Sequence, residues 1–146
     1  MPEEVPIDRR ALRAWFDTPL GRSLQVHELH RLRSALPTLY GTLAVQLGRL
    51  GPLDLLEACV VPTRILVGET VDEAGASLLA RPDEIPLATG SVDLLLLPHT
   101  LDYCEDPHGV LREVNRVLSP EGHVIVLGFN PWSWWGLRRL FTRRPR

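Results

Sequence analysis

Three side chains that can bind a ligand or move a proton lie close together in the sequence. His99, Asp102 and Tyr103 directly follow the largely apolar run 92–97 (VDLLLL). Imidazole titrates near neutral pH, so a His beside an acid at such a position can act on a substrate proton. We therefore select these three as candidate catalytic residues. The alternative is that His99 is a hydrogen-bonded structural residue, which is the more common role of a single His after a strand.

Two further turns carry residues suited to a ligand. Gly48 and Gly51 follow the apolar run 42–47 (TLAVQL), and glycines let a ligand approach the backbone closely. The G-x-G spacing is absent, so an ordinary turn between a strand and a helix also explains them. Glu69 follows a second short run, 64–67, where a carboxylate can accept hydrogen bonds from both hydroxyls of a ribose. A solvated turn acid is the alternative for Glu69.

Composition excludes several kinds of chemistry. All 16 basic residues are Arg, so a lysine nucleophile, a Schiff base and a phosphate-loop lysine are ruled out. The two cysteines, Cys59 and Cys104, are too few and too isolated for a disulfide framework or a paired-cysteine zinc site. We expect no metal site, and a reduced cytoplasmic location.

An alternation of helices and strands must position the candidate residues. Apolar runs predict strands at 42–47, 64–67, 92–97 and 123–127, with an extended piece at 84–87. Apolar spacing predicts helices at 9–17, 22–36, 52–59, 72–79 and 106–118. In the last of these, Asp106 is the expected cap and Pro107 the first helical residue. The alternation is typical of an α/β fold with a doubly wound, mostly parallel sheet, which binds ligands at the carboxyl ends of its strands.

The two ends of the chain differ in composition, and we expect no signal peptide at the first. The first residues, MPEEVP, lack the positive start and apolar core of a signal peptide, and no apolar run approaches the ~18 residues of a membrane span. The last fifteen residues combine three Trp with five Arg, which suits an anionic lipid or a nucleic-acid backbone. We favour the alternative of a helix that packs its Trp face on the sheet, and we expect no nucleic-acid partner.

The stretch from Ile85 to Gly136 resembles the class I S-adenosylmethionine-dependent methyltransferases. The similarity rests on IPL at 85–87, SVD at 91–93 and LREVNRVLSPEG at 111–122, in that order and spacing. These motifs look like those of the members that act on small molecules, and the helical lead and the GFNPWS ending at 128–133 are similar to a bacterial subgroup. The resemblance implies a Rossmann-like fold, S-adenosylmethionine as cofactor and methyl transfer to a small-molecule acceptor. Such a transfer needs little acid–base chemistry, because the sulfonium is already a strong electrophile and the protein mainly aligns the acceptor.

The resemblance also implies which residues bind the cofactor. Those near its methionine, ribose and adenine parts are Gln46, Gly48, Gly51, Glu69, Asp83, Glu84 and Ile85. His99, Asp102 and Tyr103 would face the acceptor. The family's first loop is an acid, an apolar residue and then G-x-G-x-G, whereas positions 46–52 read QLGRLGP. Leu50 therefore puts a side chain where the backbone should approach the methionine part.

The same comparison divides the chain into an N-terminal helical lead, 1–40, and a methyltransferase-like domain, 41–146, that lacks the final strand pair of the family. Without that pair, strand 123–127 would present an unpaired edge, through which a homo-oligomer could form. The sequence would then be a fragment, or another chain would cover the edge. The degenerate loop also supports a second hypothesis, a catalytically inactive scaffold that acts through protein contacts.

Overall fold

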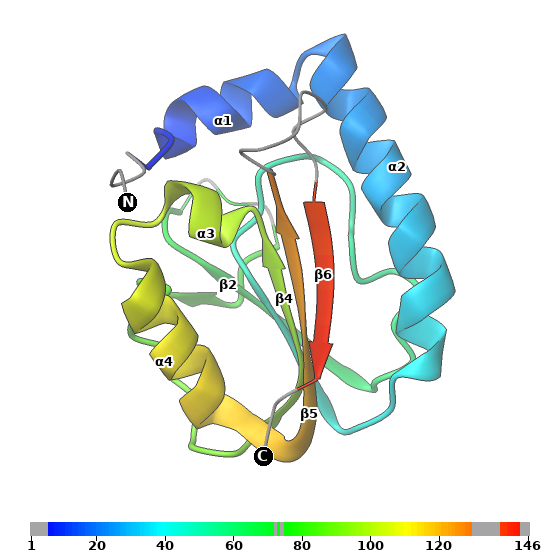
Figure 1. Cartoon of the computed structure of the whole chain (residues 1–146), viewed down its shortest axis with the longest axis vertical. Helices are drawn as coiled ribbons and strands as arrows, with labels where there is room; N and C mark the ends of the chain where they lie inside the picture. The colour runs from blue at the N-terminus through cyan, green and yellow to red at the C-terminus, as the bar shows by residue number, and fades with distance from the viewer. Residues whose placement is uncertain (1–5, 72, 74, 130–137, 144–146) are drawn as a thin grey trace.

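The computed structural model describes residues 6–71, 73, 75–129 and 138–143. Within these residues one six-stranded sheet has the order β3-β2-β1-β4-β5-β6, with β1 to β5 parallel and β6 antiparallel (Figure 1). The predicted α/β fold with a mostly parallel, Rossmann-like sheet is confirmed. Its elements are α1 (Arg9–Phe16), α2 (Pro19–Ala35), η1 (Leu36–Thr38), β1 (Leu43–Leu47), β2 (Thr63–Gly68), β3 (Leu78–Leu79), β4 (Val92–Pro98), α3 (Thr100–Tyr103), α4 (Pro107–Val117), β5 (Leu118–Gly128) and β6 (Arg138–Arg143).

The three longer helices begin at polar caps. The carboxylate of Asp8 accepts a hydrogen bond from the Ala11 N–H, and the Thr18 hydroxyl accepts one from the Gly21 N–H. These side chains satisfy backbone donors that have no partner within the helix. Asp106 caps α4 in the same way, with Pro107 in its first turn, as the sequence predicts.

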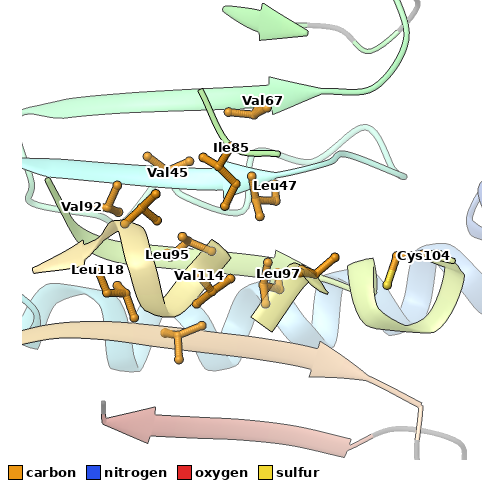
Figure 2. Packing of buried hydrophobic residues seen from close by; sticks show 13 residues of the cluster. Val45, Leu47, Val67, Ile85, Val92, Leu95, Leu97, Cys104, Val114 and Leu118 are labelled. Carbon is orange, nitrogen blue, oxygen red and sulfur yellow. The ribbon is translucent and has the colours of Figure 1, made fainter. Parts of the chain in front are cut away.

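Strand β4 separates two apolar layers. Leu95 and Leu97 belong to a cluster shared with α4, which Figure 2 shows from close by, whereas Leu94 and Leu96 belong to a cluster shared with α2. Helices α2 and α4 accordingly cover opposite faces of the sheet (Figure 1). This explains why the sequence of β4 is apolar on both sides.

Two predicted helices are not formed in the described residues. The segment 52–59 consists of turns, and Asp54 accepts a hydrogen bond from the Leu56 N–H at 3.1 Å, a local bond that competes with helix formation. In the segment 72–79, Leu78 and Leu79 form a strand beside Val67 and Gly68. The piece at 84–87 forms no strand: residues 84 and 87 are bends, and the Leu87 N–H donates to the Ile85 carbonyl at 2.8 Å.

The prediction that strand 123–127 has an unpaired edge is wrong. Strand β6 pairs antiparallel with β5, from His123 opposite Arg143 to Gly128 opposite Arg138. The helix that we expected in the Arg-rich end is therefore a strand over 138–143, because backbone pairing with β5 overrides the local pattern. The structure consequently gives no support to a homo-oligomer formed through strand 123–127. The three Trp at 132–135 lie outside the described residues.

Helix α4 fastens the segment that follows β3. Glu113 accepts a hydrogen bond from the Ile85 N–H at 2.8 Å, and Arg116 donates to the carbonyl oxygens of Ile85, at 2.8 Å, and Leu87, at 3.0 Å. The Glu113 carboxylate also bonds directly to Arg116, which is the main reason that its pKa lies below the ordinary value. The LREVNR motif thus holds the segment between β3 and β4 against α4.

Replacing Arg116 with Ala should lower the free energy of unfolding by about 1 kcal/mol, because two backbone carbonyls lose a charged donor in a partly solvated place. Urea unfolding measures this loss. The matched control is Arg112→Ala on the same helix, whose side chain is 76% exposed and lies 3.8 Å from Asp106. An equal loss in both variants would contradict the assigned role.

Candidate functional site

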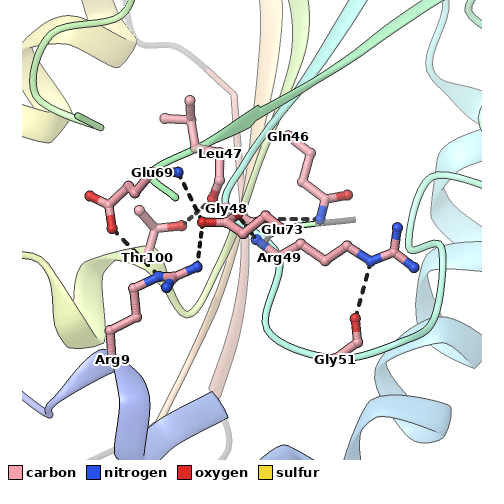
Figure 3. Close-up of polar contacts among 9 residues, drawn as sticks. All are labelled: Arg9, Gln46, Leu47, Gly48, Arg49, Gly51, Glu69, Glu73 and Thr100. Atoms are coloured by element: carbon pink, nitrogen blue, oxygen red, sulfur yellow. Dashed lines mark hydrogen bonds and ion pairs between the residues drawn. The ribbon is translucent and has the colours of Figure 1, made fainter. Parts of the chain in front are cut away.

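The carboxyl ends of β1, β2 and β4 meet at one edge of the sheet. There the Gly48 N–H donates to the carbonyl of Val67 at 2.8 Å. The Thr100 hydroxyl donates to the carbonyl of Leu47 at 2.7 Å (Figure 3). Strands β2 and β4 lie on either side of β1, so the order of connection changes direction at this point. Sheets of this kind bind ligands in the crevice outside such a switch point.

Gly48 packs against Tyr103. The backbone of Gly48 has φ +88°, and a Cβ atom there would collide with the Tyr103 hydroxyl oxygen. Burial raises the pKa of Tyr103 well above its ordinary value, so its phenol stays protonated. Gln46 is buried and donates to the Gly48 carbonyl at 2.9 Å. Three of the predicted residues, Gln46 of β1, Gly48 and Tyr103 of α3, therefore lie together at the end of β1.

The remainder of this turn is packed against the N-terminal helices. Leu50 is buried in a cluster with Leu12, Phe16 and Tyr103. Gly51 lies against the side-chain amide of Gln25, which leaves no room for a Cβ. The side chain of Leu50 thus belongs to the contact with α1.

An ionic cluster beside the turn contains two residues that the sequence analysis missed. Glu73 is 0% exposed in its side chain, and it accepts hydrogen bonds from the Arg49 N–H at 3.0 Å and the Glu69 N–H at 2.9 Å. Arg9 of α1 forms an ion pair with Glu73 and a second with Glu69, Nε to Oε2, at 3.5 Å (Figure 3). The acid-rich stretch 69–73 was the available signal, but nothing in its spacing distinguishes Glu73.

Glu69 stands where the sequence analysis placed it, directly after β2. Its side chain is 27% exposed. Partial burial is the main influence on its carboxyl and raises its pKa above the ordinary value, although the Arg9 guanidinium opposes this shift. Glu69 is therefore a partly exposed acid at the edge of the site.

A cavity of about 530 Å³ opens between the ends of β2, β3 and β4 and the start of α4. Its lining includes Arg9, Glu69, Asp83, Cys104 and Val110. Asp83 accepts two hydrogen bonds from Arg81, at 3.0 and 2.8 Å. The predicted residues Glu84 and Ile85 do not line this cavity: Glu84 is exposed, and Ile85 is buried in the core beside α4.

His99 lies outside the cavity in a buried bridge. Its Nδ1 lies 3.0 Å from Asp102 Oδ2, and its Nε2 lies 2.8 Å from Oε2 of Glu28 on α2. Burial alone would lower the pKa of His99, but the hydrogen bonds to Asp102 and Glu28 outweigh it and raise the pKa to about 9. Asp102 Oδ2 also accepts a hydrogen bond from the Phe129 N–H at 3.2 Å. The ring is therefore charged at neutral pH, with both nitrogens engaged.

Known proteins resemble this chain in sequence and in fold. Residues 41–126 match the family described as methyltransferase domain. The chain belongs to the class I methyltransferase family. S-adenosylmethionine is the expected cofactor of such a methyltransferase domain.

Bacterial relatives resemble this chain over different lengths. The uncharacterized protein YafS of Escherichia coli is 36% identical over 139 residues, which are 95% of this chain and 57% of YafS. A malonyl-[acyl-carrier protein] O-methyltransferase of Alcanivorax borkumensis is 38% identical over 56 residues, which are 38% of this chain and 19% of that protein. The chain thus spans little more than half of the length of YafS.

Solved structures show the same fold. A putative S-adenosylmethionine-dependent methyltransferase of Methanococcus maripaludis has a TM-score of 0.60 at 12% identity, over 86% of this chain and 66% of that one. A methyltransferase of Thermotoga maritima, described as a possible histamine N-methyltransferase, has a TM-score of 0.59 at 22% identity, over 83% and 63%.

Two further properties concern the described part of the chain. It contains no helix with the length and apolar character needed to cross a membrane. Nor do three or more of its His, Cys, Asp and Glu side chains gather in a way that could hold a metal ion.

Proposed function

We propose that this chain binds S-adenosylmethionine as part of a methyltransferase that acts on a small-molecule acceptor. The observation that carries the proposal is the cavity of about 530 Å³ with Glu69 in its wall. It lies where doubly wound folds bind ligands, and a partly exposed carboxylate after the second strand suits the hydroxyls of a ribose. Pro82, Cys104 and Val110 supply less polar walls for an adenine ring.

The fit differs between the two ends of the cofactor. The adenosine part suits the residues that line the cavity. Near Gly48, however, the N–H groups of Arg49 and Glu69 are already bonded to Glu73. The cofactor would supply the electrophilic methyl group, and the residues of the chain would bind the cofactor and orient it toward the acceptor.

The residues predicted to face the acceptor support a positioning role. At neutral pH the charged His99 lacks a free nitrogen to accept a proton, since Asp102 and Glu28 engage both. We propose that His99 fixes Asp102, whose carboxylate holds Phe129 and whose carbonyl oxygen accepts the Ile7 N–H at 2.9 Å. Direct contact of Asp102 or Tyr103 with an acceptor remains a prediction.

We also propose a location and a domain organisation. The free thiols of Cys59 and Cys104 suit a reducing cytoplasm, and the bacterial relatives suit a bacterial source. The family match begins at residue 41, which supports a boundary between a helical lead, 1–40, and the methyltransferase-like domain, 41–146. An inactive scaffold remains the second candidate function, favoured by Glu73, because this side chain occupies donors at the cofactor site.

Calorimetric titration of the full chain with S-adenosylhomocysteine tests the proposal. Glu69→Gln should weaken binding about tenfold, because the charge-assisted hydrogen bonds to the ribose are lost. Glu57→Gln is the matched control: Glu57 pairs with Arg33 on the surface, away from the cavity, and should bind like wild type. Absence of both heat and a thermal shift at millimolar ligand, in wild type and every variant, would contradict cofactor binding.

A further inference from the structure

Two backbone donors at the ends of neighbouring strands are bonded to one protein carboxylate. Glu73 Oε2 accepts the Arg49 N–H, from the turn after β1, at 3.0 Å, and Glu73 Oε1 accepts the Glu69 N–H, after β2, at 2.9 Å. N–H groups in such turns are the donors with which this fold type holds an anionic or hydroxyl-bearing ligand. Here the chain supplies its own anion to them.

Arg9 closes this contact from the other side. Its guanidinium pairs with Glu73 and Glu69 and lies 5.8 Å from the centre of the Tyr103 ring. Helix α1 is held in place through Leu12, which packs near Tyr103 in the cluster that also buries Leu50. Helix α1 thus contacts both the turn after β1 and the acid after β2.

The buried carboxylate depends on all of these partners. A carboxylate with no exposed surface is costly unless it is paired and hydrogen-bonded, and Arg9 and the two N–H groups meet that requirement. A ligand that used the same N–H groups would have to take the place of Glu73 and break its pair with Arg9. The contact therefore opposes binding next to Gly48, while the adenosine end of the cavity stays open.

We propose that Glu73, held by its ion pair with Arg9, is an internal competitor at the cofactor site. The amino-acid end of the cofactor binds when this ion pair breaks. The inference rests on the proposed function and deepens it. A protein whose competent form is a minor fraction binds its ligand more weakly by that same fraction. Weakening the Arg9–Glu73 ion pair should therefore strengthen the binding of a ligand that reaches Gly48. The affinity for a ligand restricted to the adenine end should stay the same.

The experiment compares S-adenosylhomocysteine with adenine on wild type, Glu73→Gln, Arg9→Gln and the control Glu57→Gln. Glu73→Gln keeps the size of the side chain, but its amide nitrogen cannot accept a hydrogen bond where a carboxylate oxygen does. We expect affinity for S-adenosylhomocysteine to rise about tenfold in Glu73→Gln and to rise in Arg9→Gln, with adenine affinity changed less than about twofold. Calorimetry measures the first ligand and ligand-observed NMR the second.

Thermal unfolding of each variant separates binding from folding. Arg9→Gln acts at a side chain that is 15% exposed and leaves Glu73 in place, so it serves if Glu73→Gln does not fold. Unchanged or weaker binding of S-adenosylhomocysteine by the folded variants, with wild type binding normally, would overturn the competitor and leave the proposed function standing. Failure of every protein to bind either ligand would overturn the proposed function and the competitor together.

Discussion

Replacing His99 with Asn should lower the free energy of unfolding by about 3 kcal/mol at neutral pH. The change removes the cation that lies between Glu28 and Asp102, and Glu28 is fully buried. A buried carboxylate that loses its partner keeps the cost of leaving water without the compensating attraction. Asn is the suitable replacement because His99 has φ +62°, a left-handed conformation that Asn tolerates better than most residues.

The same bridge makes stability depend on pH. Because the pKa of His99 is raised to about 9 in the folded protein, from an ordinary 6.5, the folded chain holds a proton that the unfolded chain has lost between these values. The stabilisation is complete below pH 6.5 and disappears as pH rises through about 9. Urea unfolding at a series of pH values should show a fall of about 3 kcal/mol over this window.

His30→Asn is the matched control for this prediction. His30 lies two positions from Glu28 on α2 and is exposed, so its replacement should change stability by less than about 0.5 kcal/mol. The fall between pH 6.5 and 9 should persist in His30→Asn and vanish in His99→Asn. A fall of the same size in both variants would show that another group causes it.

Replacing Gly48 with Ala should cost about 2 to 4 kcal/mol of stability. Two effects add at this position, since φ +88° is strained for any residue with a Cβ and the new methyl group would overlap the Tyr103 hydroxyl oxygen. The turn after β1 should shift, and with it the N–H groups that Glu73 holds. Urea unfolding measures the loss, and calorimetry with S-adenosylhomocysteine shows its effect on binding.

Gly90 separates the two effects. It has φ +70° but no atom within 4 Å of the place where a Cβ would lie, so Gly90→Ala should cost only the backbone strain, about 1 kcal/mol. Adding Tyr103→Phe to Gly48→Ala removes the overlapping oxygen and should recover part of the loss. Equal losses in Gly48→Ala and Gly90→Ala would mean that the contact with Tyr103 contributes nothing.

The elements with a strong periodic pattern were predictable from the sequence. The run at 92–97 and the stripe of α4 are apolar wherever they meet the core, and Asp106 and Pro107 mark the start of that helix. The segment 52–59 was not predictable. Its Leu55 and Leu56 are buried in the cluster shared with α2, so they are apolar although the segment forms turns and not a helix. Strand β6 was missed because its pairing with β5 is a long-range contact that no local pattern contains.

The site could be predicted only as a set of positions. The strand ends bring Gly48, Glu69 and Tyr103 to one edge of the sheet, as the topology requires, and their roles there stay predictions. The partners that determine their chemistry come from elsewhere in the chain. Glu28 of α2 is 71 residues away from His99 in the sequence, and Arg9 of α1 is 64 residues away from Glu73. Spacing along the sequence cannot show such contacts.

The strand order also determines when this chain can fold during its synthesis. Ala44 in the middle of β1 pairs with Leu94, so the central pair of the sheet waits for fifty further residues. Helix α2 is made before the strands whose Leu96 and Leu127 complete its apolar contact. Until β4 leaves the ribosome, one edge of β1 therefore stays unpaired, and until β5 follows, part of the apolar face of α2 stays exposed. Chaperones bind such surfaces, and aggregation begins from them.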